Sequence, residues 1–220
     1  MSHTLKIQEI RNLTHDVKQI RLAKPEGYTF TPGQATEVAV DRAGWTDEKR
    51  PFTFSSLVTD PWLEFVIKIY PDHKGVTEQI GQLSEGDTLI IGDPWGTIEY
   101  KDEGIFLAGG AGVTPFIAIL RDLHRKGEIG NNQLIFSNKT ERDIILKEEF
   151  ETMLGEQFVN VITDEKPSSD HGAIDKAFLT SNIKDVSQAF YVCGPDPFNE
   201  SIMAALEELG ANPDALIFEK

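Results

Sequence analysis

The chain has 220 residues, with 36 Asp and Glu against 21 Lys and Arg and a formal net charge of −15. This charge argues against general nucleic-acid binding, which needs a basic face to displace counterions from phosphate. The single cysteine, Cys193, excludes an internal disulfide and a four-cysteine iron–sulfur or zinc site built from this chain alone. No apolar run approaches the ~18 residues of a membrane span, and residues 1–11 lack the apolar core of a signal peptide, so we expect a cytoplasmic protein.

The first half of the chain has the pattern of a small antiparallel barrel. Short apolar runs alternate with Gly, Pro and Asp at a spacing of roughly 8–12 residues, which is typical of all-β domains. One short helix is expected over residues 77–83. The expected strands of this half cover residues 35–40, 51–56, 63–70 and 88–91.

The second half alternates strands with helices, which predicts a parallel sheet covered on both faces. The expected strands cover residues 105–108, 133–136, 158–163, 189–192 and 215–218, and the expected helices cover residues 116–126, 144–154 and 198–209. The pattern changes near residues 100–103. We therefore expect two domains, residues 1–102 and residues 103–220.

The segment Arg50-Pro51-Phe52-Thr53 has two readings. It is typical of a plain strand that buries Phe52 and Phe54 on one face. The same residue types also suit a flavin dinucleotide. A guanidinium binds phosphate with its fork of donors, an aromatic ring covers a planar ring, and a threonine hydroxyl donates to a ring nitrogen.

A second segment, Lys74-Gly75-Val76-Thr77, precedes the expected short helix. It reads plainly as a turn in which Thr77 is the N-cap. Alternatively, the free backbone N–H groups of this helix start, together with Lys74, would bind a pyrophosphate.

A third segment runs from Gly109 to Pro115 between a strand and a helix, and it departs from the G-x-G-x-x-G fingerprint. Its glycines would let backbone approach a phosphate, with Thr114 as helix cap and Pro115 in the first turn. An ordinary glycine-rich turn is the alternative. Cys193-Gly194-Pro195 follows another expected strand. Both segments would therefore lie at the carboxyl edge of the parallel sheet, where ligands bind. A lone buried cysteine at the end of a strand is most often a small apolar packing residue, which is the alternative for Cys193.

The polar residues indicate no other chemistry. The five histidines have no metal-ligand spacing, so no metal site is expected. The triplet Ser169-Asp170-His171 reads as a solvated loop, because adjacency in sequence is not the geometry of a catalytic triad.

Taken in this order, the four segments resemble the ferredoxin–NADP reductase superfamily, and the resemblance covers essentially the whole chain. Residues 65–70 and 138–144 are similar to the NADH–cytochrome b5 reductase branch, and Arg50-Pro51-Phe52 is similar to the small NAD(P)H:flavin reductases. The resemblance implies an N-terminal antiparallel Greek-key β-barrel that binds FAD, over residues 1–102. It also implies a C-terminal α/β domain with a parallel sheet that binds NAD(P), over residues 103–220.

The resemblance also implies roles for single residues. Arg50 would bind the FAD pyrophosphate, and Pro51 would also contact the cofactor. Phe52 would lie beside the flavin, and Thr53 would reach its hydride-accepting nitrogen. Ile67, Ile69 and Tyr70 would line the flavin and adenine side of FAD, and Gly75, Val76 and Thr77 would bind its phosphate. The implied nucleotide contacts are Gly110, Gly112, Val113, Thr114, Pro115, Cys193, Gly194 and Pro195. Thr53 and Cys193 are the expected catalytic residues, because they would touch the reacting rings.

Two departures from the family pattern stand out. Phe52 replaces the commoner tyrosine and lacks its hydroxyl. The chain stops at Phe218-Glu219-Lys220, where many relatives continue to a terminal aromatic residue that covers the flavin. We therefore expect one flavin face to be more open.

The expected reaction is hydride transfer from NAD(P)H to FAD, followed by electron transfer to a separate acceptor such as a ferredoxin, a flavodoxin, a cytochrome or an oxygenase component. A flavin reductase that uses free flavin as substrate and a non-catalytic flavin- or nucleotide-binding module are the alternatives. NADH is favoured over NADPH because Glu141 stands between Lys139 and Arg142. A basic docking patch for an acidic acceptor has candidates in Arg11, Lys18, Arg21 and Lys24, although an ordinary solvated strand face is the favoured explanation of these residues.

Overall fold

The computed structural model describes residues 2–96, 98–164, 172–212 and 216–218. The chain divides into two compact units, of which unit 1 comprises residues 1–97 and 114–122 and unit 2 comprises residues 98–113 and 123–220. Helix α2 (Thr114–Lys126) therefore begins in unit 1 and ends in unit 2. The boundary expected between residues 102 and 103 stays a prediction.

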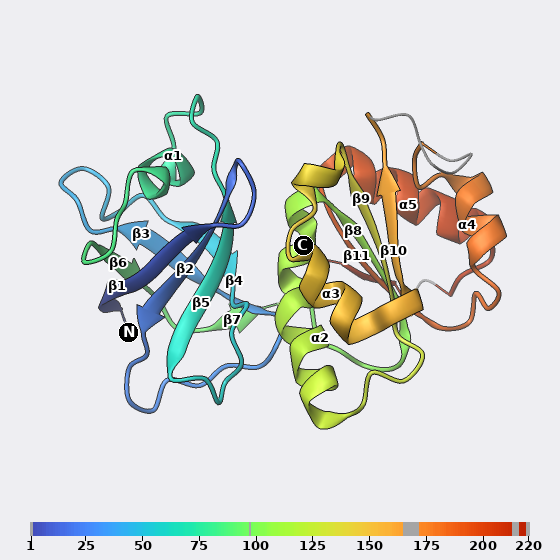
Figure 1. Cartoon of the computed structure of the whole chain (residues 1–220), viewed down its shortest axis with the longest axis horizontal. Coiled ribbons are helices and arrows are strands. Elements are labelled where there is room, and N and C mark those ends of the chain that lie inside the picture. Colours follow the sequence, from blue (N-terminus) through green and yellow to red (C-terminus); the bar gives the residue numbers. More distant parts are fainter. Residues whose placement is uncertain (1, 97, 165–171, 213–215, 219–220) are drawn as a thin grey trace. The chain divides into compact units, whose positions relative to one another are not determined.

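Unit 1 contains the expected antiparallel barrel sheet, with strand order β4-β3-β6-β1-β2-β5 and β7 paired with β3 (Figure 1). Its strands are β1 (His3–Asn12), β2 (Val17–Ala23), β3 (Gln34–Val40), β4 (Arg50–Thr53), β5 (Trp62–Lys68), β6 (Thr88–Ile91) and β7 (Trp95–Gly96). The short helix is α1 (Val76–Gly81). The predicted fold class of this half is confirmed, although β4 is shorter than the expected strand because the chain turns toward β5 after Thr53, where Phe54 forms an isolated bridge with Phe65.

The core of the barrel is filled by side chains that alternate along its strands. Phe54 stacks on Phe30 with ring centroids 4.3 Å apart, and Phe65 lies 5.1 Å from Phe54 on another side. All three rings are buried. Because strand side chains point alternately to opposite faces, Phe65 points into this core while its neighbours Glu64 and Val66 point to the opposite face, where they are also buried.

Unit 2 contains a parallel sheet with strand order β10-β9-β8-β11-β12. Its strands are β8 (Gly104–Gly109), β9 (Gln133–Asn138), β10 (Phe158–Ile162), β11 (Ala189–Cys193) and β12 (Leu216–Phe218). Its helices are α3 (Lys147–Leu154), α4 (Lys176–Asn182) and α5 (Asp196–Glu208), with 3-10 turns η1 (Gly110–Val113), η2 (Glu141–Asp143) and η3 (Gly155–Gln157). The expected alternation of strands and helices is confirmed, and α4 was not among the expected helices.

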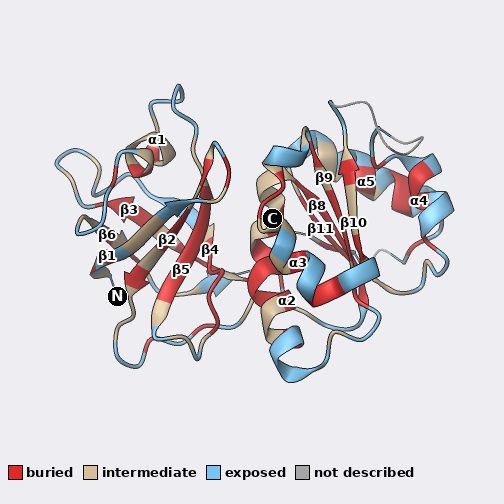
Figure 2. Ribbon diagram, in the orientation of Figure 1, coloured by how far each residue is buried: buried red, intermediate tan, exposed pale blue. Residues whose placement is uncertain are grey.

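Helices cover both faces of this sheet. Phe150 of α3 contacts Phe136 of β9 on one face, with ring centroids 6.4 Å apart. On the other face, α4 and α5 pack in one apolar cluster with strand residues such as Leu107 and Val192. Every residue of β8 is consequently buried, as the colouring of Figure 2 shows along the centre of the sheet. Strands buried on both faces explain the continuous apolar runs of the sequence.

The segment in which the pattern changes from all-β to α/β is held to the sheet of unit 2 by Tyr191. The hydroxyl of Tyr191 accepts hydrogen bonds from the backbone N–H groups of Lys101, at 2.9 Å, and Asp102, at 3.1 Å, and donates to the Asp102 carbonyl at 2.8 Å. Its ring stacks on Phe106 with centroids 4.4 Å apart. Burial raises the pKa of the Tyr191 phenol, which keeps this donor protonated.

Two predicted helix caps are wrong. Gly75, not Thr77, is the N-cap of α1, and no side chain caps that helix. Thr114 is the first residue of α2 rather than its cap, because η1 leads into the helix and Val113 is already in helical conformation. The prediction of Pro115 in the first turn is confirmed. It fits there because the N–H groups of a first turn have no partner within the helix.

The triplet Ser169-Asp170-His171 and the first residue of the last expected strand, Ala215, lie outside the described residues. No helix in the described part of the chain is both long and apolar enough to cross a membrane.

Candidate functional site

Strand β4 presents the first predicted segment at the edge of the barrel sheet. It pairs with β3, with Arg50 opposite Val38 and Thr53 opposite Ala35. An edge strand tolerates Pro51, since its missing N–H leaves no gap in the ladder. Arg50 is exposed, and its Nη1 donates to the Lys49 carbonyl at 2.6 Å. The guanidinium therefore keeps donors that can face an anion.

The next residues of this strand turn inward. Phe52 is half-buried against the barrel core, and Thr53 is buried. The plain reading of Phe52 as a packing residue therefore holds for part of its ring, and the rest can meet a ligand. Beyond Thr53, the Ser55 N–H donates to the Glu64 carbonyl at 2.8 Å, and the Glu64 N–H donates to the Ser56 hydroxyl at 3.0 Å. These bonds hold the end of β4 against β5.

The end of β5 carries three predicted flavin contacts with different exposures. Ile67 lies inside the barrel core, and Ile69 is half-buried against it. Tyr70 is 39% exposed, and its ring is parallel to that of His73 with centroids 4.9 Å apart. Of the three side chains, Tyr70 offers the most surface to a planar ligand.

An ion pair holds the last residue of β5, Lys68, in place. Lys68 Nζ lies 2.9 Å from Asp16 Oδ2. Burial alone would raise the pKa of Asp16, but the hydrogen bonds from Lys68 and Thr14 outweigh it and lower the pKa. Lys68 is thereby engaged in a structural role near Tyr70.

The second predicted segment turns sharply before α1. Lys74 has a φ of +49°, and Gly75 is extended. Val76 is buried and Thr77 is half-buried. A Cβ built on Gly75 would meet a single described neighbour, the His73 carbonyl at 3.8 Å, which is an ordinary contact. Packing within the described residues therefore gives no reason for a glycine here, and the space beside Gly75 is open to a ligand.

The third segment and Cys193 meet at the carboxyl edge of the parallel sheet, as expected. Ala108 at the end of β8 pairs with Cys193 at the end of β11. A Cβ on Gly112 would overlap the Cys193 carbonyl oxygen and would lie 2.6 Å from the Gly194 Cα. Gly112 is therefore the residue that lets η1 lie directly on the Cys193–Gly194 backbone.

At two further positions of this edge, Gly109 and Gly194, a side chain would likewise collide with its neighbours. A Cβ on Gly109 or on Gly194 would come within 3.0 Å or 2.5 Å of the Phe198 ring. Gly110 instead has a φ of +53° and no neighbour within 4 Å of a Cβ, so its requirement is conformational. Glycines thus make the edge thin enough for backbone N–H groups to approach a ligand.

The remaining predicted residues of this edge differ in exposure. Val113 and Pro115 are buried, whereas Gly110, Gly112 and Thr114 are half-buried. Cys193 is 5% exposed, Gly194 is half-buried and Pro195 is exposed. The burial of Cys193 agrees with its interpretation as a packing residue. Its small exposed surface can still contact a ring of a bound ligand.

Sequence reasoning missed a buried carboxylate, Glu64 of β5, and its partner Arg121 of α2. Glu64 is 1% exposed, and its Oε1 accepts from Arg121 Nη1 at 2.6 Å. Burial alone would raise the pKa of Glu64, but the charge and hydrogen bond of Arg121, with bonds from Arg21 and Ser55, hold that pKa below its usual value. An acidic residue inside the apolar run from Leu63 to Ile67 was the available signal.

The four basic residues considered as a docking patch each contact other parts of unit 1. Arg11 Nε donates to the Gln19 side chain, and Lys18 Nζ donates to the Gly81 carbonyl at 2.7 Å. Arg21 contacts Glu9 and Glu64, both at 2.8 Å, and Lys24 Nζ donates to the Val58 carbonyl. These contacts favour the reading as an ordinary strand face.

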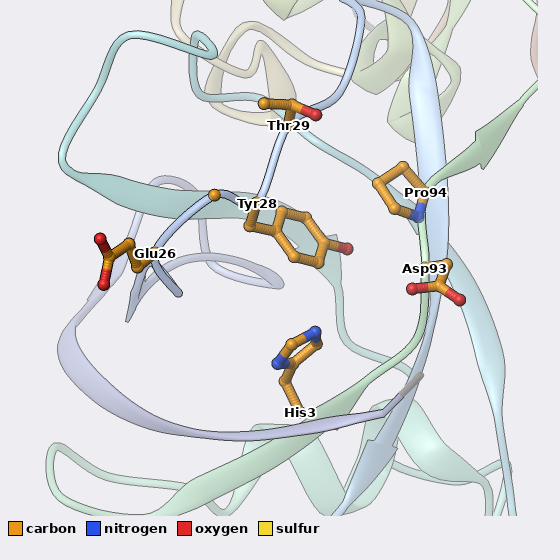
Figure 3. A pocket seen from close by; sticks show the side chains of 7 residues that line it. His3, Glu26, Tyr28, Thr29, Asp93 and Pro94 are labelled. Atoms are coloured by element: carbon orange, nitrogen blue, oxygen red, sulfur yellow. The ribbon is translucent and has the colours of Figure 1, made fainter.

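A pocket of about 260 Å³ lies elsewhere on the barrel (Figure 3). It is lined by His3, Glu26, Gly27, Tyr28, Thr29, Asp93 and Pro94, and contains none of the predicted site residues. The Tyr28 hydroxyl donates to the Gly92 carbonyl at 2.8 Å, and the Tyr28 ring meets His3 edge-on at 5.6 Å. Burial, together with the charge of Asp93, raises the pKa of Tyr28. Among the described residues, no group of three or more His, Cys, Asp or Glu side chains could hold a metal ion.

An antiparallel barrel with an exposed arginine on its edge strand, and a parallel sheet with a glycine-thinned carboxyl edge, define a class of flavin- and pyridine-nucleotide-dependent oxidoreductases. Family models agree with that class. Residues 4–100 match the oxidoreductase FAD-binding domain, and residues 106–203 match the oxidoreductase NAD-binding domain. The chain belongs to the family of oxidoreductases that combine an FAD-binding domain with an NAD-binding domain and that includes NADH-cytochrome b5 reductases.

Individual relatives span several branches of that family. NADH-cytochrome b5 reductase 2-A of Vanderwaltozyma polyspora is 30% identical over 88% of this chain and 71% of its own length. The reductase component of propane 2-monooxygenase of Rhodococcus jostii is 27% identical over 98% of this chain and 62% of its own length. The chain thus spans less than two thirds of several curated relatives, at 62–63% of their length.

A solved structure supports the fold alone. The ferredoxin NADP+ reductase of Neisseria gonorrhoeae with bound FAD and NADP has a TM-score of 0.84 and 19% identity, over 99% of this chain and 98% of that one.

Proposed function

We propose that this chain takes hydride from a reduced nicotinamide nucleotide onto bound FAD and passes the electrons to a separate acceptor. The observation that carries the proposal is the arrangement of β4, where an exposed Arg50 and a half-exposed Phe52 precede a buried Thr53 on an edge strand. This strand presents an anion-binding group, an aromatic surface and a hydroxyl in one row.

The donors and surfaces of unit 1 fit FAD. Arg50 would bind the pyrophosphate through a charge-assisted hydrogen bond, and Phe52 and Tyr70 would provide aromatic surface. The open space beside Gly75 would admit phosphate oxygens to the backbone. When bound, FAD accepts two electrons as a hydride and can release them one at a time.

Two further polar groups of unit 1 would suit hydrogen bonds to FAD. Thr53 would donate its hydroxyl to a flavin ring nitrogen. Glu78, in the first turn of α1, has a buried Oε2 without a hydrogen-bond partner among the described residues. A ligand hydroxyl would satisfy this acceptor, and the ribityl and ribose groups of FAD carry such donors.

The nicotinamide nucleotide would lie along the carboxyl edge of the sheet of unit 2 and the start of α2. Gly110, Gly112 and Thr114 would face it, while Val113 and Pro115 would hold the turn in shape. Cys193, Gly194 and Pro195 would contact the reacting end. Gly112 lets η1 and the Cys193 segment share one surface, because no side chain separates them.

The chain's residues would act by positioning. Hydride transfer needs the donor carbon and the acceptor nitrogen held about 3–3.5 Å apart, and correct placement alone accounts for a large part of the acceleration. No acid or base is required of the protein for the hydride itself. Thr53 and Cys193 would therefore orient the rings, not exchange protons with them.

NADH is the nucleotide that we propose for this chain. Recognition of a 2′-phosphate needs cations just after the second strand of the sheet. That loop offers Lys139 and Arg142, but Glu141 lies between them, and the Asp164 N–H donates to the Lys139 carbonyl at 2.9 Å, which brings another acidic residue to the loop. Steady-state rates with NADH and with NADPH test the preference, and faster turnover with NADPH would contradict it.

The acceptor that we propose is a protein, such as a cytochrome or an oxygenase component. The support is that the relatives are named as a cytochrome b5 reductase and as the reductase component of a monooxygenase. A flavin reductase that uses free flavin remains the second candidate, favoured by the exposure of Arg50 and Phe52 on the open edge strand.

The deciding experiment is gel filtration followed by anaerobic addition of NADH. The proposal expects flavin to elute with the protein and its visible absorbance to bleach with NADH. A colourless protein that reduces added flavin would support the second candidate instead. A yellow protein that does not bleach with either nucleotide would identify a binding module without hydride transfer.

A further inference from the structure

A buried carboxylate in unit 1 joins helix α2 to two strands of the barrel. Glu64 of β5 is 1% exposed. Besides Arg121 Nη1 at 2.6 Å, it accepts from Arg21 Nε at 2.8 Å and from the Ser55 hydroxyl at 2.9 Å. The same Arg121 nitrogen also donates to the Ser55 carbonyl at 2.7 Å. One guanidinium therefore binds both a side chain of β5 and the backbone that follows β4.

All of these residues belong to unit 1, which includes residues 114–122 of helix α2. Arg121 follows Thr114 by seven residues, which places both on one face of the helix about 10 Å apart along its axis. On the barrel side, Ser55 lies two residues after Thr53. The Arg121 contacts thus join the helix that begins with a proposed nucleotide residue to the strand that ends with a proposed flavin residue.

The Glu64 carboxylate and its arginine partners are held in fixed positions. A buried carboxylate is stable when its oxygens are bonded to several donors, and losing one partner leaves an uncompensated charge. Arg21 is held in turn, since its Nη1 lies 2.8 Å from Glu9 and its guanidinium lies 4.6 Å above the Trp62 ring. Glu64 is therefore fixed from both sides, and it holds Arg121 in one position.

We propose that Arg121 is a positioning residue for hydride transfer: through Glu64 and the Ser55 carbonyl it sets the position of Thr114 relative to Thr53. The proposal rests on the proposed function. Arg121 would touch neither substrate nor cofactor, and its effect on the reaction would pass through the placement of Thr114 and Thr53.

The test compares Arg121→Met and Arg121→Lys with the wild-type holoenzyme. Three quantities are measured: the flavin content and visible spectrum, the anaerobic rate of flavin reduction at saturating NADH, and the melting temperature. Arg125→Met is the matched control, because Arg125 is exposed one turn further along the same helix.

We expect Arg121→Met to retain flavin with an altered visible spectrum and to reduce it about tenfold to a hundredfold more slowly at saturating NADH, since misplacement by about 1 Å costs up to a hundredfold. Arg121→Lys keeps the charge and a donor, so it should restore part of the rate, and Arg125→Met should match the wild type. If Arg121→Met does not fold, Arg121→Lys decides, with a rate about threefold to tenfold below the wild type.

A lowered melting temperature with wild-type reduction rate and spectrum, in whichever of these variants folds, would show that Arg121 only stabilises the fold and would overturn the proposal. Failure of the proposed function is distinct: the wild-type protein would then bind no flavin, or its flavin would not bleach with NADH, and the inference would fall with it.

Discussion

Arg50, Thr53 and Cys193 were chosen as site residues by their type and order, but they differ in how far each is exposed. Their types and order are visible in the sequence, and they predicted a flavin and nucleotide protein. Their exposures are not visible: Arg50 is exposed, whereas Thr53 is 8% and Cys193 5% exposed. Exposure depends on which face of a strand meets the core, which in turn depends on distant residues. The roles of the three residues therefore stay predictions that need variants.

Replacing Arg50 by alanine should weaken FAD binding. Loss of a charge-assisted hydrogen bond to phosphate costs about 1.5–3 kcal/mol, which is about tenfold to a hundredfold in affinity. Flavin release measured by fluorescence during dilution would give the dissociation constant. Arg42→Ala is the control, because Arg42 is a half-exposed barrel arginine paired with Asp87 at 3.4 Å. If Arg50→Ala binds FAD as tightly as Arg42→Ala does, Arg50 does not hold the pyrophosphate.

Replacing Cys193 by alanine should slow reduction by NADH without loss of flavin. The sulfur would touch the reacting rings, and imperfect placement of those rings should slow hydride transfer by about tenfold or more. Flavin content and the anaerobic reduction rate should be measured on the same preparation. Equal rates in variant and wild type would assign Cys193 to packing alone.

The elements of the fold were largely predictable from local patterns. The core strands of both units and helix α5 follow apolar periodicity, which needs no knowledge of distant residues. The details at element ends were not predictable in the same way. The sequence Gly109–Pro115 reads as a loop followed by a capped helix, but η1 continues into α2, so Val113 takes the N-cap position and Thr114 is already the first residue of the helix. Such a joint depends on the close approach of Cys193, which comes from another element.

Gly112→Ala tests the close contact between Gly112 and the Cys193–Gly194 backbone. A Cβ at this position would overlap the Cys193 carbonyl and would lie 2.6 Å from the Gly194 Cα, so backbone must move. Overpacking of this kind typically costs about 1–3 kcal/mol. We expect a lower melting temperature and a raised KM for NADH, measured by thermal unfolding and steady-state kinetics.

The control for Gly112→Ala is Gly127→Ala at the C-terminus of α2. Gly127 has a φ of +72° and no neighbour within 4 Å of a Cβ, so its substitution brings conformational strain without overlap. It should lower stability and leave the KM for NADH unchanged. Equal effects of the two substitutions on KM would contradict a specific role of the Gly112–Cys193 contact in nucleotide binding.

At the scale of the whole molecule, local sequence patterns do not disclose contacts between distant residues. Glu64 and Arg121 are 57 positions apart, and neither periodicity nor spacing indicates that they meet. The net charge of −15 likewise says nothing about which carboxylates are buried and paired. Such pairs nevertheless decide how stability depends on pH, because a buried carboxylate bonded to arginines binds protons less readily in the folded chain than in the unfolded one.

The last prediction concerns the acid stability of the protein and follows from Glu64. Its pKa is lowered in the folded state, so the stabilisation it contributes is fully present above the unfolded value of about 4.3 and is lost as the pH falls through the lower folded value. The free energy of unfolding of the wild type should therefore fall on acidification below about pH 4.3, by about 1.4 kcal/mol for each unit by which the two pKa values differ.

Glu64→Gln cannot titrate, so it should be less stable than the wild type at pH 7 and should lose less stability between about pH 5 and pH 3. Glu208→Gln is the control, because the Lys176–Glu208 pair is exposed and contributes little. Denaturant unfolding at a series of pH values measures all three proteins, and parallel curves for Glu64→Gln and the wild type would show that Glu64 keeps an ordinary pKa.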